Sequence, residues 1–121
     1  MSTPGDVPRL DTGSAEFTAL PGFEGGFQSI LYTSPDGRRL AGSFKEKGSH
    51  IMTMPFDEFI FVIAGTTSIA VTDGDSFTLG AGQCCYLREG QEVSFEMSDD
   101  FHDVVVLASD TPFDVNDLDL E

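Results

Sequence analysis

The sequence predicts a single all-β domain whose strands form a sandwich or a barrel. Short segments rich in Val, Ile, Phe, Thr and Tyr alternate with Gly, Pro and Asp turn signals about every eight to twelve residues. No segment keeps the helical spacing of apolar residues over about three turns. A chain of 121 residues is long enough for one domain with a hydrophobic core, but not for two.

Turn signals separate the expected strands. The first strand, residues 28–34, is followed by Pro-Asp-Gly at residues 35–37, where Pro presets a turn dihedral and Gly supplies a positive φ. A second turn, Asp-Gly-Asp at residues 73–75, separates two later strands. The remaining strands are expected over residues 39–47, 50–54, 58–65, 66–72, 76–80, 83–88, 91–97 and 102–109.

Alternation along the strands predicts which side chains face the interior, because neighbouring residues of a strand point to opposite faces. Val93 and Phe95 alternate with acidic and polar residues, so both are expected on the interior face. In residues 39–47, Ser43 and the lysines are expected to face outward, which places Phe44 inside.

The strand over residues 58–65 is apolar on both faces. Glu58 shares its inward face with Ile60, whereas Phe59 and Phe61 share the other face. We expect a second layer over that outer face, supplied by the N-terminal arm or by a second subunit. A symmetric homodimer is the usual solution.

The two ends differ in composition from the middle of the chain. Residues 1–14 are rich in Pro, Gly, Ser and Asp and are expected to form a flexible arm. Residues 110–121 mix acidic and apolar residues after a strand-ending proline and are expected to form an acidic tail. The barrel domain is therefore expected over residues 15–109.

The charge of the chain excludes some partners. The net charge is −15, from 21 acidic and 6 basic residues. Phosphates of nucleic acids and anionic membrane surfaces need Lys and Arg, so neither is expected as a partner. The acidic excess is interpreted as a self-repelling soluble surface, as an adaptation to high salt, or as a docking face for a basic partner.

The cysteines and the apolar segments indicate a cytoplasmic protein. Cys84 and Cys85 are adjacent, and neighbours on a strand point apart, so two reduced thiols are expected. The sequence opens without a signal-peptide-like apolar region and contains no apolar run of about eighteen residues.

Residues 28–109 resemble the cupin superfamily. The resemblance rests on PDGRRLAGSF at residues 35–44, on residues 55–90, and on the closing strands. The Asp-Glu pair followed by an apolar run and Gly resembles the small single-domain cupins related to ureidoglycine aminohydrolase and the ethanolamine-utilisation cupin. This resemblance implies a double-stranded β-helix, a jelly-roll barrel whose mouth usually holds the site.

The first cupin motif is retained only at its end. Glu58 and Gly65 have the spacing of its glutamate and final glycine. Met52 and Met54 stand where its two histidines would be, and the nearest counterpart of its leading glycine is Gly48.

The second cupin motif keeps its glycines but loses its metal ligand. Gly82 and Gly90 match, whereas Arg88 stands at the proline, Val93 at the histidine and Met97 at the asparagine. Of the family's metal ligands only the glutamate remains. The resemblance therefore implies a pocket without a standard metal centre, and no cofactor is expected.

Two non-standard metal sites are alternatives. His50, Glu58 and His102 could hold a divalent transition metal from neighbouring strands. Met52 and Met54, together with a cysteine, have the soft ligands that Cu(I) prefers. The simpler interpretation is that the methionines fill the core.

Glu58 is the strongest candidate for chemistry. Apolar neighbours would remove its hydration and raise its pKa, which is how a carboxyl group is tuned for proton transfer near neutral pH. It is predicted to act as a general acid/base or to anchor a ligand amine or hydroxyl. The alternative is a carboxylate at the barrel rim, paired with Arg88 or hydrogen-bonded to backbone.

The other expected ligand contacts surround this carboxylate. Arg88 could bind an anionic ligand or balance local negative charge, and Tyr86 could donate its hydroxyl into the pocket or belong to the core. The complete set expected to bind a small organic ligand is Phe44, Met52, Met54, Glu58, Ile60, Tyr86, Arg88, Val93 and Phe95.

Three functions remain open at this point. The first is a metal-independent pocket that binds a small organic ligand in small-molecule metabolism. The second is an isomerase, lyase or aminohydrolase that uses Glu58 as its catalytic acid/base. The third is an interaction module that acts through its acidic surface or tail.

Overall fold

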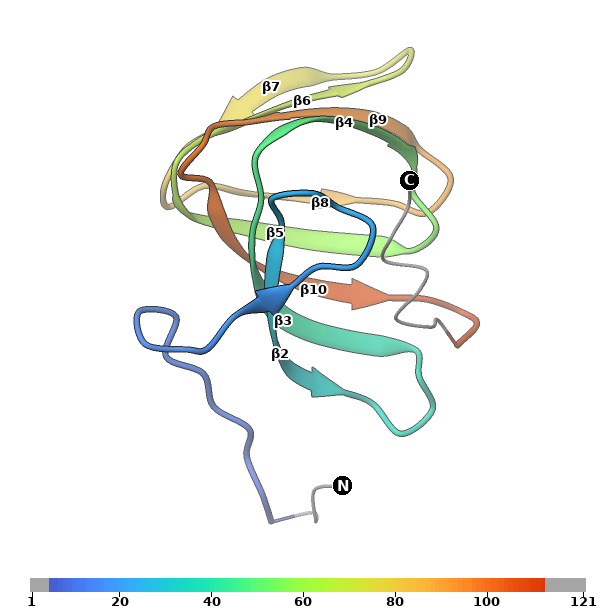
Figure 1. The fold of residues 1–121 in the computed structure, drawn as a ribbon. Helices are drawn as coiled ribbons and strands as arrows, with labels where there is room; N and C mark the ends of the chain where they lie inside the picture. Colours follow the sequence, from blue (N-terminus) through green and yellow to red (C-terminus); the bar gives the residue numbers. More distant parts are fainter. Residues whose placement is uncertain (1–4, 113–121) are drawn as a thin grey trace.

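The computed structural model describes residues 5–112, which form ten strands and no helix (Figure 1). The strands are β1 (Thr18–Ala19), β2 (Phe27–Thr33), β3 (Arg39–Lys45), β4 (Gly48–Thr53), β5 (Asp57–Ala64), β6 (Thr67–Val71), β7 (Ser76–Leu79), β8 (Cys84–Leu87), β9 (Glu92–Met97) and β10 (His102–Ala108). Every predicted strand is present, and the two-residue β1 is the one strand that the sequence pattern did not predict.

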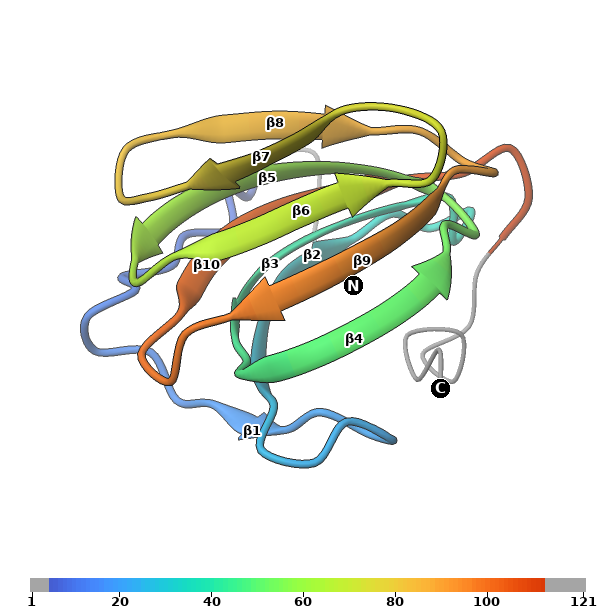
Figure 2. The same ribbon diagram turned by 90° about the horizontal axis from the view of Figure 1, so that it is seen from above.

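Two antiparallel sheets face each other and enclose the core. One sheet has the strand order β1-β2-β3-β10-β5-β8, and the other has the order β4-β9-β6-β7. Figure 2 shows β6, β9 and β4 lying across β5, β10 and β3. The predicted all-β, single-domain jelly-roll barrel is therefore confirmed.

The inward faces of the two sheets supply the core. Ile60 and Val62 of β5 and Val93 and Met97 of β9 are buried and belong to one core cluster. Their burial follows the two-residue period of the strands, as predicted. Removing such side chains from water is the main force that holds the sheets together.

The outer face of the six-stranded sheet is apolar and partly open to solvent. Phe61 of β5 is 40% exposed, Tyr86 of β8 is 57% exposed and Val106 of β10 is 43% exposed. Residues 5–112 of one chain therefore do not provide the second layer expected over Phe61. The homodimer that would cover this face stays a prediction.

Another part of the outer face is covered by the N-terminal segment. Ser43 was expected to face outward, and it lies on the outward face with His102, but it is fully buried there. Its hydroxyl donates to the Asp103 carbonyl at 2.9 Å and lies 2.8 Å from the His102 Nε2 atom. The ring of Phe17 packs edge-on against His102, with 5.6 Å between ring centroids. Alternation alone could not predict this cover, because it comes from a segment far away in sequence.

The ends of the chain are only partly described. Residues 5–14 contain no strand, and β1 begins four residues later. Most of the predicted acidic tail, residues 113–121, lies outside the described residues. Within residues 5–112 there is no helix with the length and apolarity to cross a membrane.

Gly65→Ala is expected to be far more destabilising than Gly82→Ala. Both glycines have positive φ, 75° and 87°, which costs an alanine about 1 kcal/mol. Only Gly65 is also crowded, because an added Cβ would lie 2.7 Å from the Phe101 Cα and 2.6 Å from the Ser98 Oγ. We expect a loss of at least about 3 kcal/mol for Gly65→Ala, measured by urea unfolding. Equal losses for the two variants would contradict the crowding.

Candidate functional site

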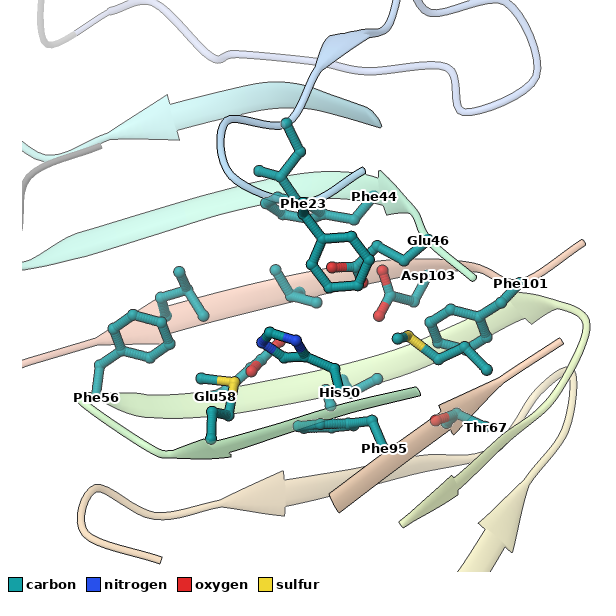
Figure 3. Close-up of a pocket in the computed structure, with 16 residues that line it drawn as sticks. Phe23, Phe44, Glu46, His50, Phe56, Glu58, Thr67, Phe95, Phe101 and Asp103 are labelled. Carbon is teal, nitrogen blue, oxygen red and sulfur yellow. The ribbon is translucent and has the colours of Figure 1, made fainter. Parts of the chain in front are cut away.

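A cavity of about 70 Å³ lies between the two sheets. Most of its wall is apolar and includes five phenylalanine rings, those of Phe23, Phe44, Phe56, Phe95 and Phe101. Leu20, Met52, Ile60, Met97, Val105 and Leu107 complete the apolar wall. The polar side chains that reach it are Glu46, His50, Glu58, Thr67 and Asp103 (Figure 3).

The polar groups come from both sheets. Glu58 lies on β5, Asp103 on β10, and Glu46 directly follows β3, so the six-stranded sheet supplies all three carboxyl groups. His50 on β4 and Thr67 on β6 face them from the four-stranded sheet. The antiparallel register of β3 and β10 pairs Asp103 with Phe44, one of the ring-bearing wall residues.

Each carboxyl group faces the cavity because of strand alternation. Asp103 shares the inward face of β10 with Val105 and Leu107, both of which also line the cavity. Glu46 continues the inward face of Phe44 beyond the end of β3. Val105 and Leu107 thus fix the direction of Asp103, and Phe44 fixes that of Glu46.

Burial raises the pKa of all three carboxyl groups. Loss of hydration raises the pKa of Glu58 to about 8, with a further contribution from the negative charge of Glu46. Desolvation also raises the pKa of Glu46 to about 7. The pKa of Asp103 lies well above its usual value, first because of burial and then because of the charges of Glu46 and Glu58. Glu46 and Glu58 are both half-buried and line the cavity.

Two polar atoms at the cavity have no hydrogen-bond partner among residues 5–112. The Asp103 Oδ1 and Thr67 Oγ1 atoms are buried and unpaired, in residues that are 2% and 1% exposed. An unpaired buried polar atom is costly, and such atoms are usually satisfied by a bound molecule or water. These two atoms face the cavity from opposite sheets, so a polar occupant could reach both.

Thr67→Val is expected to stabilise the free protein by about 1 kcal/mol, because it removes an unpaired buried hydroxyl and keeps the shape of the side chain. Urea unfolding measures the change. Thr78→Val is the matched control, since the Thr78 hydroxyl is partnered by the Ser68 Oγ at 2.9 Å and its loss should bring no gain. A destabilised Thr67→Val protein would mean that the Thr67 hydroxyl is hydrogen-bonded in solution.

Among the described residues that line the cavity there is no Lys or Arg, so none of them gives the carboxyl groups a permanent counter-charge. His50 is the one basic residue among the lining residues, and its ring lies 4.9 Å from the Phe23 ring, centroid to centroid. Phe23 comes from the connection between β1 and β2, and Figure 3 shows its ring in front of Glu46 and Asp103.

The residues at the family's metal positions do not fit a metal centre. Met52 lines the cavity, Met54 is buried beyond the end of β4, and Val93 is a fully buried core residue. Across residues 5–112, no group of three or more His, Cys, Asp and Glu side chains is arranged to hold a metal ion.

The structure brings together part of the predicted ligand set. Phe44, Met52, Glu58, Ile60 and Phe95 line the cavity. The two other apolar members lie in the adjacent core without reaching it; these are Met54 and Val93.

Tyr86 and Arg88 correct the prediction, because both are exposed outside the cavity. The Tyr86 hydroxyl donates to the Asp57 carboxylate at 2.6 Å, and the Glu89 backbone N–H donates to the same carboxylate at 2.8 Å. These hydrogen bonds, followed by the charge of Arg88, lower the pKa of Asp57. The alternative in which Glu58 pairs with Arg88 is therefore not formed.

His102 also differs from its predicted position. His50 and Glu58 do line the cavity, but His102 occupies the outward position next to Asp103 and pairs with Ser43. Strand alternation separates His102 from the other two residues, so the proposed His50–Glu58–His102 site is not assembled. The Cu(I) alternative likewise lacks its geometry, because Cys84 is exposed and Met54 does not reach the cavity.

The sequence interpretation missed two of the three carboxyl groups. Glu46 follows Phe44 by two residues, and Asp103 precedes Val105 by two residues. The same alternation that placed Phe44 inside could have placed Glu46 there. Phe23 and Phe101 carry no such signal, because they lie in connections between strands.

Two facing antiparallel sheets of this topology, with a side-chain-lined cavity between them, define the cupin class of proteins. Within that class the chain belongs to the EutQ-like cupin domain family, whose sequence model matches residues 33–102. No curated protein matches the chain in sequence.

Solved structures with the same fold include two EutQ proteins. The ethanolamine utilization protein Q of Salmonella typhimurium LT2 has a TM-score of 0.73 and 21% identity, covering 89% of this chain and 90% of its own. The Clostridium difficile EutQ protein has a TM-score of 0.59 and 26% identity, covering 84% of this chain and 75% of its own.

A third solved structure shows the same fold in a protein with a different name. The polyketide cyclase RemF of Streptomyces resistomycificus has a TM-score of 0.66 and 18% identity, covering 89% of this chain and 83% of its own. Likeness at this level of identity concerns the fold and carries no activity across.

Proposed function

We propose that the chain binds a small organic molecule in the barrel cavity, with Glu58 as a polar anchor and without a standard cupin metal centre. The observation that carries this proposal is the pair of buried, unpaired polar atoms, Asp103 Oδ1 and Thr67 Oγ1, at a largely apolar cavity. Ligand pockets typically combine apolar walls with a few convergent polar groups of this kind.

The size of the cavity limits the ligand. A volume of about 70 Å³ accommodates a few water molecules or an organic molecule of a few non-hydrogen atoms. The name of the Salmonella relative, an ethanolamine utilization protein, refers to the metabolism of a molecule of that size. This supports a role in small-molecule metabolism for the present chain.

The proposal is tested on protein purified without chelator. Native mass spectrometry should detect a small organic molecule, and methyl NMR should show that its removal shifts the signals of Met52 and Met97, which line the cavity. The buried Met54 methyl, which does not line the cavity, is the internal reference. Stoichiometric Mn, Fe, Ni or Zn in elemental analysis would contradict the metal-free pocket.

An enzyme that uses Glu58 as general acid/base is the second candidate. The pKa of Glu58, raised to about 8, is close to the value that suits proton transfer near neutral pH. Glu46, with a pKa raised to about 7, is a second group that could exchange a proton at the same cavity. Turnover of the co-purified molecule with a pH profile that Glu58→Gln changes would support catalysis, whereas release of the molecule unchanged would support binding alone.

A further inference from the structure

We infer that the ligand is a small primary ammonium ion, held by Glu46, Glu58 and Asp103 and enclosed by the aromatic rings of the cavity. This inference rests on the proposed function and names the class of its ligand. It depends on the charge of the cavity, on its hydrogen-bonding capacity and on the nature of its walls.

The charge of the cavity favours a cation. Three carboxyl groups line one cavity, and no Lys or Arg of residues 5–112 lines it with them. The charge of Glu46 raises the pKa of Glu58, and the charges of both raise the pKa of Asp103. An anionic ligand would add to this repulsion, and a neutral one would leave it unchanged. A bound monocation offsets the repulsion without requiring the arrangement of ligands that a metal ion needs.

The hydrogen-bonding capacity matches a primary ammonium group. Such a group has three N–H donors and no acceptor, whereas ionised carboxylates are acceptors only. The Asp103 Oδ1 atom is unpaired and buried at the cavity, so it offers an acceptor that no group of the described residues uses. Glu46 and Glu58 supply further acceptors from two other places on the same sheet.

The walls suit an organic cation rather than a hydrated inorganic one. Phe23 and Phe95 present rings to the cavity, and ring faces attract ammonium groups when water is excluded. Met52 and Met97 supply apolar contacts for the carbon atoms of the ligand. The apolar contacts favour the carbon atoms of an organic cation over a hydrated sodium ion.

The buried Thr67 hydroxyl is a second, independent sign of a polar occupant. Its Oγ1 atom is unpaired, and Thr67 lies on the four-stranded sheet, across the barrel from the carboxyl groups. Burial raises the pKa of the nearby Cys85 thiol to about 11, with a further contribution from the charge of Glu58.

The experiment compares three molecules of similar size that differ in charge: ethylammonium, ethanol and acetate. Each is titrated into the full chain, freed of any co-purified molecule, at about pH 8 and at constant ionic strength, with the Met52 and Met97 methyl signals as the readout. We expect saturable binding of ethylammonium, about tenfold or more tighter than that of ethanol or acetate.

Three variants locate the binding of the cation. Glu46→Gln and Asp103→Asn should each weaken ethylammonium binding about tenfold, because each removes one charged acceptor. Glu89→Gln, the same kind of change at an exposed residue outside the cavity, should leave it within about twofold. Two cavity variants are used so that the result does not depend on the folding of either one.

The outcomes separate this inference from the proposed function. Ethanol or acetate could bind as tightly as ethylammonium or tighter, as followed through the Met52 and Met97 methyl signals. That result would overturn the inference that the ligand is an ammonium ion, and the proposed ligand-binding cavity would remain. Equal effects of Glu89→Gln and Glu46→Gln also overturn it, because the cation would then be attracted by surface charge. Failure of all three probes, with no co-purified molecule, overturns both proposals.

Discussion

Glu58→Gln is expected to weaken ligand binding by roughly ten- to a hundredfold while the fold stays intact. The substitution keeps the size of the side chain and removes its charge, and hydrogen bonds to charged groups contribute about 1.5–3 kcal/mol. The fold should tolerate it, because Glu58 makes no ion pair with Arg88 and its ionised form is disfavoured by burial. The affinity for the co-purified molecule, followed through the Met52 and Met97 methyl signals, measures the effect.

Glu89→Gln is the matched control for this change. It replaces an exposed carboxylate by an amide outside the cavity, so ligand affinity should remain that of the unchanged protein. Circular dichroism and urea unfolding verify that both variants are folded. If the Glu58→Gln protein binds with unaltered affinity, Glu58 is a structural residue, and the polar anchors of the ligand are Glu46 and Asp103.

The ligand-free protein is expected to lose stability as the pH rises from about 5 to about 8. The pKa of Glu58 is raised from 4.5 to about 8 in the folded chain. Between these two values the folded state retains a proton that the unfolded state has released, so the free energy of unfolding falls with rising pH. Since each unit of pKa shift corresponds to about 1.4 kcal/mol, the loss of unfolding free energy has an upper limit of roughly 5 kcal/mol. Access of solvent through the cavity reduces this loss to a few kcal/mol.

The other cavity carboxyls act in the same direction. Glu46 has its pKa raised from 4.5 to about 7, so its contribution is present at about pH 5 and is lost as the pH rises through about 7. Asp36 and Asp57 act in the opposite direction, because hydrogen bonds lower their pKa values. The stability that they contribute is lost only as the pH falls below about 4. This loss is small, since both side chains are in contact with solvent.

Urea unfolding at a series of pH values tests this expectation. Glu58→Gln should flatten the curve between about pH 5 and about pH 8, whereas Glu89→Gln should keep its slope. A bound ammonium ion should also flatten it, because the cation stabilises the ionised carboxylates. A stability that rises over this range would mean that the cavity carboxylates are ionised and compensated in the folded protein.

Alternation in the sequence was sufficient to predict the strands and part of the site. Glu58 and Ile60 were predicted on one face of their strand, and both line the cavity. The prediction succeeded here because the neighbouring strands have one polar face and one apolar face. This difference shows which alternate residues point inward. Asp103 and Glu46 carried the same signal and were overlooked.

The position of Tyr86 shows where that signal ends. Its strand, Cys84–Leu87, is apolar at both parities, so the sequence contains no indication of which face is inside. The structure resolves the phase, because Leu87 is buried in the core while Tyr86 lies outside and bonds to Asp57. Arg88 follows the same outward phase.

The amino-acid sequence alone was enough to specify an all-β barrel of the cupin kind, with Glu58 inside it and without the histidines that usually accompany that glutamate. The all-β barrel and the inward Glu58 depend on local periodicity and on the spacing of turns, whereas the cupin kind and the missing histidines depend on the resemblance to the cupin motifs; all of these are properties of short segments. The meeting of Glu46, Glu58 and Asp103 in one cavity could be seen only in the folded chain. Their proximity depends on the pairing of β3, β10 and β5, and strand pairing joins residues that are distant in sequence.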